Sequence, residues 1–159
     1  MYLRTPEIIL NEQENMCYLG DSLSLLDKVE ADIFYLDPPY NQRQYAPNYH
    51  LLETIARYDN PQIKGVSGMR DYQQQKSTFC NAQAALVSLE KIVQQGKYQH
   101  LLLSYNDEGI MPEAEILGIL RSQQLHVEVV DFDYLRFKSN SKGSNQKKFI
   151  KEKLYLASK

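Results

Sequence analysis

The stretch that most constrains this chain is residues 33–40, Ile-Phe-Tyr-Leu-Asp-Pro-Pro-Tyr. Its first four residues are apolar and include aromatic and β-branched side chains, which favours a short buried β-strand. Two prolines follow Asp37, and because proline has no N–H and a fixed φ, they cannot continue a sheet ladder. The strand is therefore expected to stop abruptly, with Asp37 just past its carboxyl end. In an open α/β sheet, this is the position at which ligands bind.

Strand and helix signals alternate along the rest of the chain. Apolar runs predict strands, and helical periodicity predicts helices. The expected strands are residues 8–10, 16–19, 32–36, 100–105, about 125–137 and 148–157; the expected helices are residues 22–29, 48–58, 78–96 and a stretch opened by Pro112. The last two strands are expected to pair in antiparallel fashion, because their connection is too short for a crossover helix. This pattern predicts a single α/β domain over residues 1–159 with a three-layer sandwich architecture.

Local signals set the expected helix boundaries. Thr78 is a good N-cap for the third helix, and Gly96 stands where a C-terminal glycine belongs. The apolar positions of residues 48–58, from Leu51 to Ala56, fall on one face of a helix. Glycine, proline and polar residues predict a loop over residues 59–77.

Composition excludes several classes of protein. The chain has 159 residues, of which 43% are hydrophobic and 24% charged, values ordinary for a globular protein. No run approaches the ~18 apolar residues of a membrane span, and the N-terminus lacks the hydrophobic core of a signal peptide. Cys17 and Cys80 show no metal-ligand spacing. We therefore expect no metal site, two reduced core thiols and a cytoplasmic location.

The charges are unevenly distributed. The formal net charge is only −2, which argues against a surface that is basic throughout. Residues 136–153, however, carry seven basic residues and one acidic residue. Such a segment can bring a basic edge to a phosphate backbone, or it can be a solvated loop whose lysines confer solubility. Charge alone leaves both interpretations open.

Two blocks of residues resemble a known enzyme family. The first is residues 35–45, Tyr-Leu-Asp-Pro-Pro-Tyr-Asn-Gln-Arg-Gln-Tyr, with Asn-Tyr-His-Leu-Leu after it at 48–52; the second is residues 103–109, Leu-Ser-Tyr-Asn-Asp-Glu-Gly. Together they resemble the D12-class, or DNA adenine methylase, family of N6-adenine-specific DNA methyltransferases. The resemblance extends more loosely from about Glu7 to the end of the chain. It implies a Rossmann-like fold that uses S-adenosylmethionine, here in a partial form ending in the antiparallel hairpin.

The resemblance also implies a reaction, the transfer of a methyl group from S-adenosylmethionine to N6 of adenine in DNA, within a restriction–modification system. Adenine N6 is a poor nucleophile because its lone pair is delocalised into the ring. By resemblance, the Asp37 carboxylate and the Pro38 carbonyl accept its two amino hydrogens and free that lone pair. Pro39 would shape the wall of the site. Tyr40 would stack on the base once it is flipped out of double-stranded DNA.

Other residues receive roles from the same resemblance. Asp37 and Asp21 are expected near the cofactor, although Gly-Asp is also a routine turn. The residues expected to contact DNA are Tyr45, Asn48, Tyr105, Asn106, Lys138 and Lys142. For Tyr105 and Asn106, packing is an equal alternative.

Two parts found in family members are missing from this sequence. It contains no Gly-x-Gly, the pattern of the family's cofactor loop, and no target-recognition region ahead of the catalytic motif. We therefore expect the final third of such an enzyme, in which residues 32–36 form an exposed strand edge. That edge would pair with a second copy or with a separate N-terminal polypeptide. An inactive fragment or subunit, and a methyltransferase acting on guanine N2 in ribosomal RNA, remain alternatives.

Overall fold

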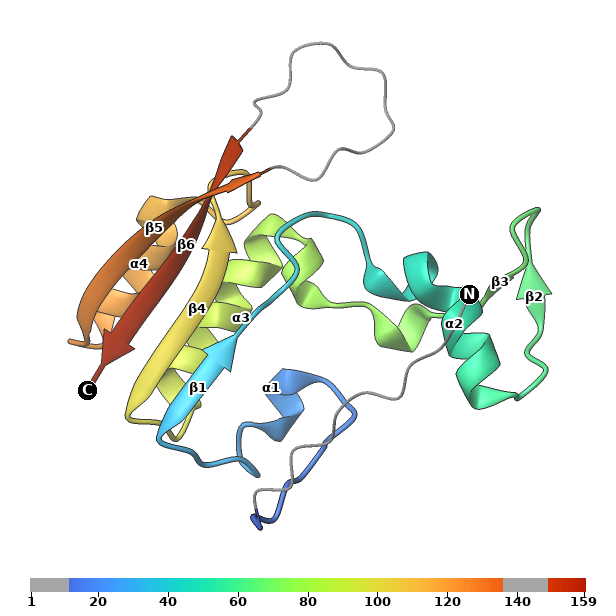
Figure 1. The fold of residues 1–159 in the computed structure, drawn as a ribbon, viewed down its shortest axis with the longest axis horizontal. Helices are drawn as coiled ribbons and strands as arrows, with labels where there is room; N and C mark the ends of the chain where they lie inside the picture. Colours follow the sequence, from blue (N-terminus) through green and yellow to red (C-terminus); the bar gives the residue numbers. More distant parts are fainter. Residues whose placement is uncertain (1–11, 136–148) are drawn as a thin grey trace.

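The computed structural model describes residues 12–135 and 149–159, whose largest sheet has four strands. The strand order is β1 (Ile33–Leu36), β4 (His100–Asn106), β6 (Phe149–Ser158) and β5 (His126–Leu135), as Figure 1 shows. β1 pairs with β4 in parallel, and the other two pairings are antiparallel. The closing antiparallel hairpin is thus confirmed. Within the described sheet, β1 lies at an edge.

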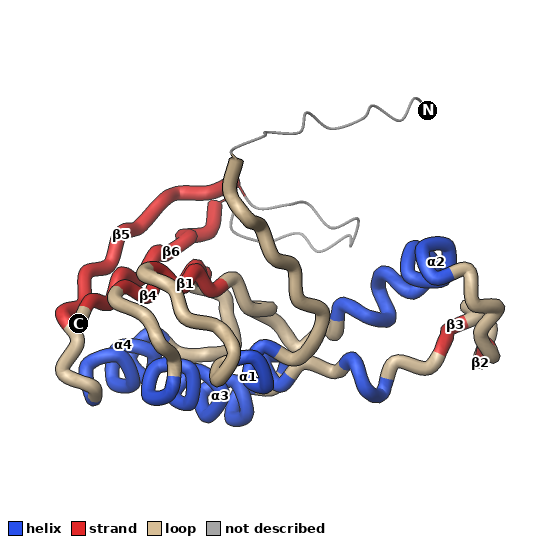
Figure 2. The backbone as a smooth tube through the Cα atoms, turned by 90° about the horizontal axis from the view of Figure 1, so that it is seen from below, coloured by secondary structure: helices blue, strands red, loops and turns tan. Residues whose placement is uncertain are grey.

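Helices cover one face of this sheet. α3 (Ala82–Gln95) lies on the connection from β1 to β4, and α4 (Glu113–Ser122) follows β4. Together with α1 (Ser22–Leu25), they lie below the strands in Figure 2. The core forms between these layers, and its largest fully buried side chains are Leu89, Ile92, Leu101, Leu103, Ile116, Leu120 and Tyr155.

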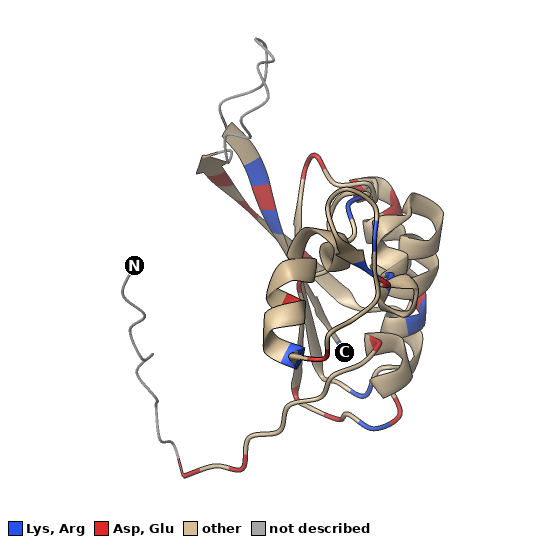
Figure 3. Cartoon of the chain, turned by 90° about the vertical axis from the view of Figure 1, so that its right-hand side faces the viewer, with Lys and Arg blue, Asp and Glu red and all other residues tan. Residues whose placement is uncertain are grey.

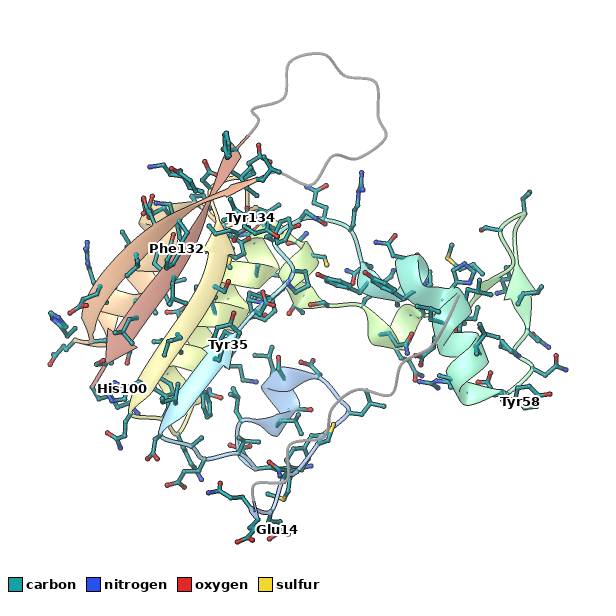
Figure 4. The ribbon with its side chains drawn as sticks, in the orientation of Figure 1. Glu14, Tyr35, Tyr58, His100, Phe132 and Tyr134 are labelled. Atoms are coloured by element: carbon teal, nitrogen blue, oxygen red, sulfur yellow. The ribbon has the colours of Figure 1, made fainter. Side chains whose placement is uncertain are left out.

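The opposite face of the sheet carries no helix in the described part of the chain (Figure 2). Tyr35, Phe132 and Tyr134 lie on this face and are 61%, 53% and 55% exposed (Figure 4). The described residues therefore form two layers of a mixed α/β fold. The third layer of the expected sandwich is not confirmed.

A second, smaller unit extends away from the sheet (Figure 1). It consists of α2 (Tyr45–Arg57) and the hairpin of β2 (Ile63–Lys64) and β3 (Met69–Arg70). The Arg70 guanidinium joins the hairpin to the helix: it donates to both carboxylate oxygens of Asp59, at 2.6 and 3.2 Å, and to the Thr54 hydroxyl at 3.3 Å. α2 buries none of its own residues.

The N-terminal part of the described chain differs from the prediction. Residues 16–19 form no strand, and Cys17 is exposed, so the expectation of a core thiol is wrong for Cys17 and right for Cys80. An apolar run becomes a strand only if a neighbouring strand satisfies its backbone, and no strand of the described residues pairs with this run. α1 is also shorter than the expected helix at 22–29. The expected strand at residues 8–10 lies outside the described residues.

The third helix begins later than expected. Thr78–Cys80 forms a separate 3₁₀ turn (η2), and Asn81 caps α3 by accepting a hydrogen bond from the Ala84 N–H at 3.0 Å. Asparagine caps helices as well as threonine does, so residue type alone could not choose between them. Gly96 does end the helix as expected. α2 starts at Tyr45 rather than at residue 48, and the expected loop contains the β2–β3 hairpin and η1 (Gln73–Gln75).

Candidate active site

Asp37 stands where the two parallel strands of the sheet end. Leu36 is the last residue of β1 and pairs with Leu103 of β4, so Asp37 lies one residue beyond the paired segment. Its side chain is exposed, whereas Pro38 and Pro39 are half-buried. The predicted abrupt end of the strand is confirmed, and it leaves an accessible carboxylate at the carboxyl edge of the sheet.

The loop that follows β4 fixes the loop that follows β1. The Ile110 N–H donates to the Tyr40 carbonyl at 2.9 Å. Behind this contact, the Tyr105 hydroxyl accepts a hydrogen bond from the Met111 N–H at 3.1 Å, and the ring is buried. Gly109 packs against that ring so closely that a Cβ there would lie 2.1 Å from Cε1. This geometry supports packing, rather than DNA contact, for Tyr105.

Asn106 also turns inward at this edge. It is almost fully buried, and its Oδ1 accepts a hydrogen bond from the Glu108 N–H at 3.2 Å. In the sheet register, it lies opposite Glu152 of β6, a strand along which basic and acidic residues alternate (Figure 3). Asn106 thus supports the loop that holds Tyr40, which again favours the packing alternative.

Glu152 is a neighbour of the candidate site that no sequence pattern identified. Burial raises the pKa of its carboxyl group; a hydrogen bond with Asn106 opposes this, and the negative charges of Asp37 and Asp107 raise the pKa further. Glu152 therefore lies within electrostatic reach of Asp37. Only the pairing of β6 with β4 brings the two carboxylates together, so no local pattern could have identified it.

The segment after Tyr40 is anchored at several points. The Asn41 side chain accepts a hydrogen bond from the Arg43 N–H at 2.8 Å. Gln44 pairs with the backbone of Ser77, donating to its carbonyl at 3.0 Å and accepting from its N–H at 2.7 Å. The Gln44 amide therefore satisfies both backbone groups of Ser77, as a paired strand would. It links the segment after Tyr40 to the residue that precedes η2.

An open hollow of about 640 Å³ lies between α2, residues 74–79 and the turn that begins α1. Asp21, Tyr45 and Tyr49 are among its lining residues, and the two tyrosine rings stack with centroids 5.8 Å apart. One Asp21 oxygen accepts a hydrogen bond from the Leu23 N–H at 2.9 Å and caps α1. Burial, followed by the charges of Tyr40 and Asp37, raises the pKa of Tyr45. Tyr45 of the hollow is therefore within electrostatic reach of Asp37, although Asp37 itself is not a lining residue.

The remaining predicted residues are more dispersed. Asn48 is exposed on α2, and Lys138 and Lys142 lie outside the described residues. Across residues 12–135 and 149–159, no cluster of three or more His, Cys, Asp or Glu side chains could hold a metal ion. None of the helices in that part of the chain is both long enough and apolar enough to cross a membrane.

A family model described as D12 class N6 adenine-specific DNA methyltransferase matches residues 2–119, which include both blocks around Asp37 and Tyr105. The chain belongs to this family. The match confirms the resemblance and leaves β5 and β6 of this D12 chain outside the matched region.

Curated relatives of this D12 chain are modification methylases. It is 42% identical to the type II methyltransferase M.FokI of Planomicrobium okeanokoites over 88% of this chain, and 36% identical to the modification methylase StsI of Streptococcus sanguinis over 86%. It is 37% identical to the type II methyltransferase M.NlaIII of Neisseria lactamica over 77% of this chain. The chain spans only 22%, 21% and 36% of these three relatives. No solved structure matches it.

Proposed function

We propose that this chain is the catalytic part of an enzyme that transfers a methyl group from S-adenosylmethionine to adenine N6 in DNA, within a cytoplasmic restriction–modification system. The observation that carries the proposal is the Asp-Pro-Pro-Tyr segment at the carboxyl edge of β1, fixed by the bond from Ile110 to Tyr40. The names of the relatives favour DNA modification over methylation of guanine in ribosomal RNA.

Each residue of the segment has a definite task in this proposal. The Asp37 carboxylate and the Pro38 carbonyl accept the two amino hydrogens of a flipped adenine, and the proline ring holds that carbonyl in place. Tyr40, which is partly exposed, stacks on the base, and Pro39 forms the wall beside it. N6 can then attack an electrophilic methyl group in line, and the surplus proton leaves to water afterwards.

The hollow beside Asp21 supports the presence of a cofactor site. S-adenosylmethionine, when bound, supplies a methyl group activated by its sulfonium charge. A nucleoside is well matched by stacked aromatic rings together with a carboxylate, and Tyr45, Tyr49 and Asp21 provide these. Asp37 is the fourth residue that we place near the cofactor.

The open sheet supports a polypeptide partner. The edge of β1 and the face carrying Tyr35, Phe132 and Tyr134 leave apolar surface uncovered in the described residues (Figure 4). Such surfaces mark sites of association. This chain spans only 22%, 21% and 36% of three of its relatives. We infer that a separate N-terminal half, or a second copy, covers this surface and completes a Rossmann-like three-layer sandwich.

Transfer of labelled methyl groups to unmethylated duplex DNA tests the proposed function. The chain is assayed alone and together with the N-terminal part of M.FokI, and Asp37→Ala is assayed beside it. Incorporation that disappears in the variant is expected in at least one of these assays. Incorporation that persists in Asp37→Ala, or that is found only with ribosomal RNA as acceptor, would contradict the proposal.

A further inference from the structure

The backbone of Arg43 is fixed while its side chain is left free. Its N–H donates to Asn41 Oδ1 at 2.8 Å, and its carbonyl accepts a hydrogen bond from the buried Cys80 thiol at 3.3 Å. The adjacent residue, Gln44, is clamped to Ser77 by two hydrogen bonds. The Arg43 side chain is nevertheless exposed. The fold therefore holds this position in place three residues beyond Tyr40 without using its charge.

The other described arginines have structural roles. Arg57 forms an ion pair with Glu53, and Arg70 forms one with Asp59. Arg121 lies in the last turn of α4, where positive charge is favourable to the helix dipole. Within residues 12–135 and 149–159, Arg43 is the arginine that has neither an ion pair nor a helix end to stabilise.

The surroundings of Arg43 have the character of a nucleic-acid surface. Tyr40 lies three residues before it in the sequence, and both the Tyr40 ring and the Gln42 side chain are exposed. Aromatic rings interleaved with positive charge are typical of surfaces that follow a polynucleotide backbone. Arg43 is not among the residues that line the hollow beside Asp21. Its charge is therefore available on the outer side of the site.

We propose that Arg43 binds a phosphate group of the DNA strand that carries the target adenine. This inference rests on the function proposed above. The planar guanidinium matches phosphate oxygens with two parallel hydrogen bonds, and its charge persists at any working pH. The carboxylate of S-adenosylmethionine is a second anion with similar chemistry. Phosphate is favoured because Arg43 does not line the hollow assigned to the cofactor.

The salt dependence of DNA binding tests this proposal. The affinity of the chain for a fluorescent duplex is measured by anisotropy over a series of KCl concentrations, for wild type, Arg43→Gln and Arg121→Gln. Both variants lose one positive charge. Arg43→Gln is expected to weaken binding by roughly tenfold near 0.1 M salt and to reduce the log–log salt slope by about 0.9. Arg121→Gln is expected to retain the wild-type slope.

Three other results would each overturn the proposal, and they can be told apart. If wild type binds DNA and Arg43→Gln binds with the same salt slope, Arg43 makes no phosphate contact, and the proposed function is unaffected. If Arg43→Gln loses S-adenosylmethionine binding in calorimetry but retains DNA binding, the anion that Arg43 binds is the carboxylate of the cofactor. Failure of the wild-type chain to bind DNA at any salt concentration would count against DNA recognition by this chain itself.

Discussion

Gly109 determines how closely the two loops of the site can approach. The Tyr105 ring occupies the space that any side chain at position 109 would need, and the chain turns there toward Ile110, whose N–H bonds to Tyr40. Position 109 therefore requires glycine, because the Tyr105 ring leaves no room for a Cβ. Residues 37–40 are thus held in position by a glycine that lies outside the proposed site.

Gly109→Ala is expected to lower the free energy of unfolding by about 1–3 kcal/mol, because the added methyl group overlaps the buried ring. Urea denaturation gives the measurement. Gly118→Ala is the matched control, since that glycine lies inside α4 with nothing within 4 Å of an added Cβ. The control should be stabilised by about 0.5–1 kcal/mol. Equal effects of the two substitutions would contradict the close-contact argument.

Gln44 uses both ends of its amide, which makes it sensitive to a change of a single atom. Gln44→Glu removes the N–H donor to the Ser77 carbonyl and places a carboxylate oxygen against that carbonyl oxygen, so that two acceptors repel each other. We expect a loss of about 1–3 kcal/mol in stability. Gln42→Glu introduces the same charge at an exposed position and should have little effect. Thermal unfolding of both variants is the test. A Gln44→Glu variant as stable as wild type would show that the two hydrogen bonds to Ser77 do not stabilise the fold.

At the scale of elements, β1 differs most from its neighbours. It has only four residues, pairs along one side within the described sheet, and still presents Ile33 and Tyr35 to the open face. Edge strands in folded proteins are usually short, charged or covered. β1 is short but neither charged nor covered by any described segment, so association is expected to begin there.

Tyr35→Lys places a charge in the middle of this edge and is expected to suppress self-association of the chain. Sedimentation velocity over a range of concentrations measures the effect. Val87→Lys is the control, because Val87 is similarly exposed but lies on α3, on the helical side of the sheet. If the two variants associate equally, the surface that mediates association lies elsewhere.

At the scale of the whole molecule, β6 links the core to the site. Tyr155 of this strand is packed in the core, where burial raises the pKa of its phenol to about 12, and Glu152 reaches the edge near Asp37. Folding thus brings Glu152 within electrostatic reach of Asp37, the carboxylate of the proposed site. Since burial disfavours its ionised form, Glu152 contributes least to stability when it is charged.

This arrangement predicts a pH dependence with a definite sign. The folded-state pKa of Glu152 is raised, so its contribution is most favourable below its unfolded pKa and declines as pH rises through the folded value. Glu152→Gln lacks this decline. The stability of the variant relative to wild type is therefore expected to increase from about pH 4 to about pH 7. Urea midpoints at both values measure the difference, and a difference independent of pH would contradict it.

The sequence by itself determined the elements whose signals are local. The apolar run at residues 33–36 and the two prolines fixed a strand and its abrupt end, and the same kind of signal identified β4, the closing hairpin and the start of α4. The two blocks around Asp37 and Tyr105 together indicated the family, which the match over residues 2–119 confirms. These predictions held because hydrophobic periodicity and proline geometry act within a few residues.

Only the tertiary structure decided which residues meet and which remain exposed. Leu51, Leu52 and Ile55 form an apolar helix face as predicted, yet all three are exposed, because α2 extends away from the sheet. Glu152 reached the site through the pairing of β6 with β4, and Tyr105 turned into the core. Burial and strand pairing depend on segments distant in the sequence, so no local pattern carries that information.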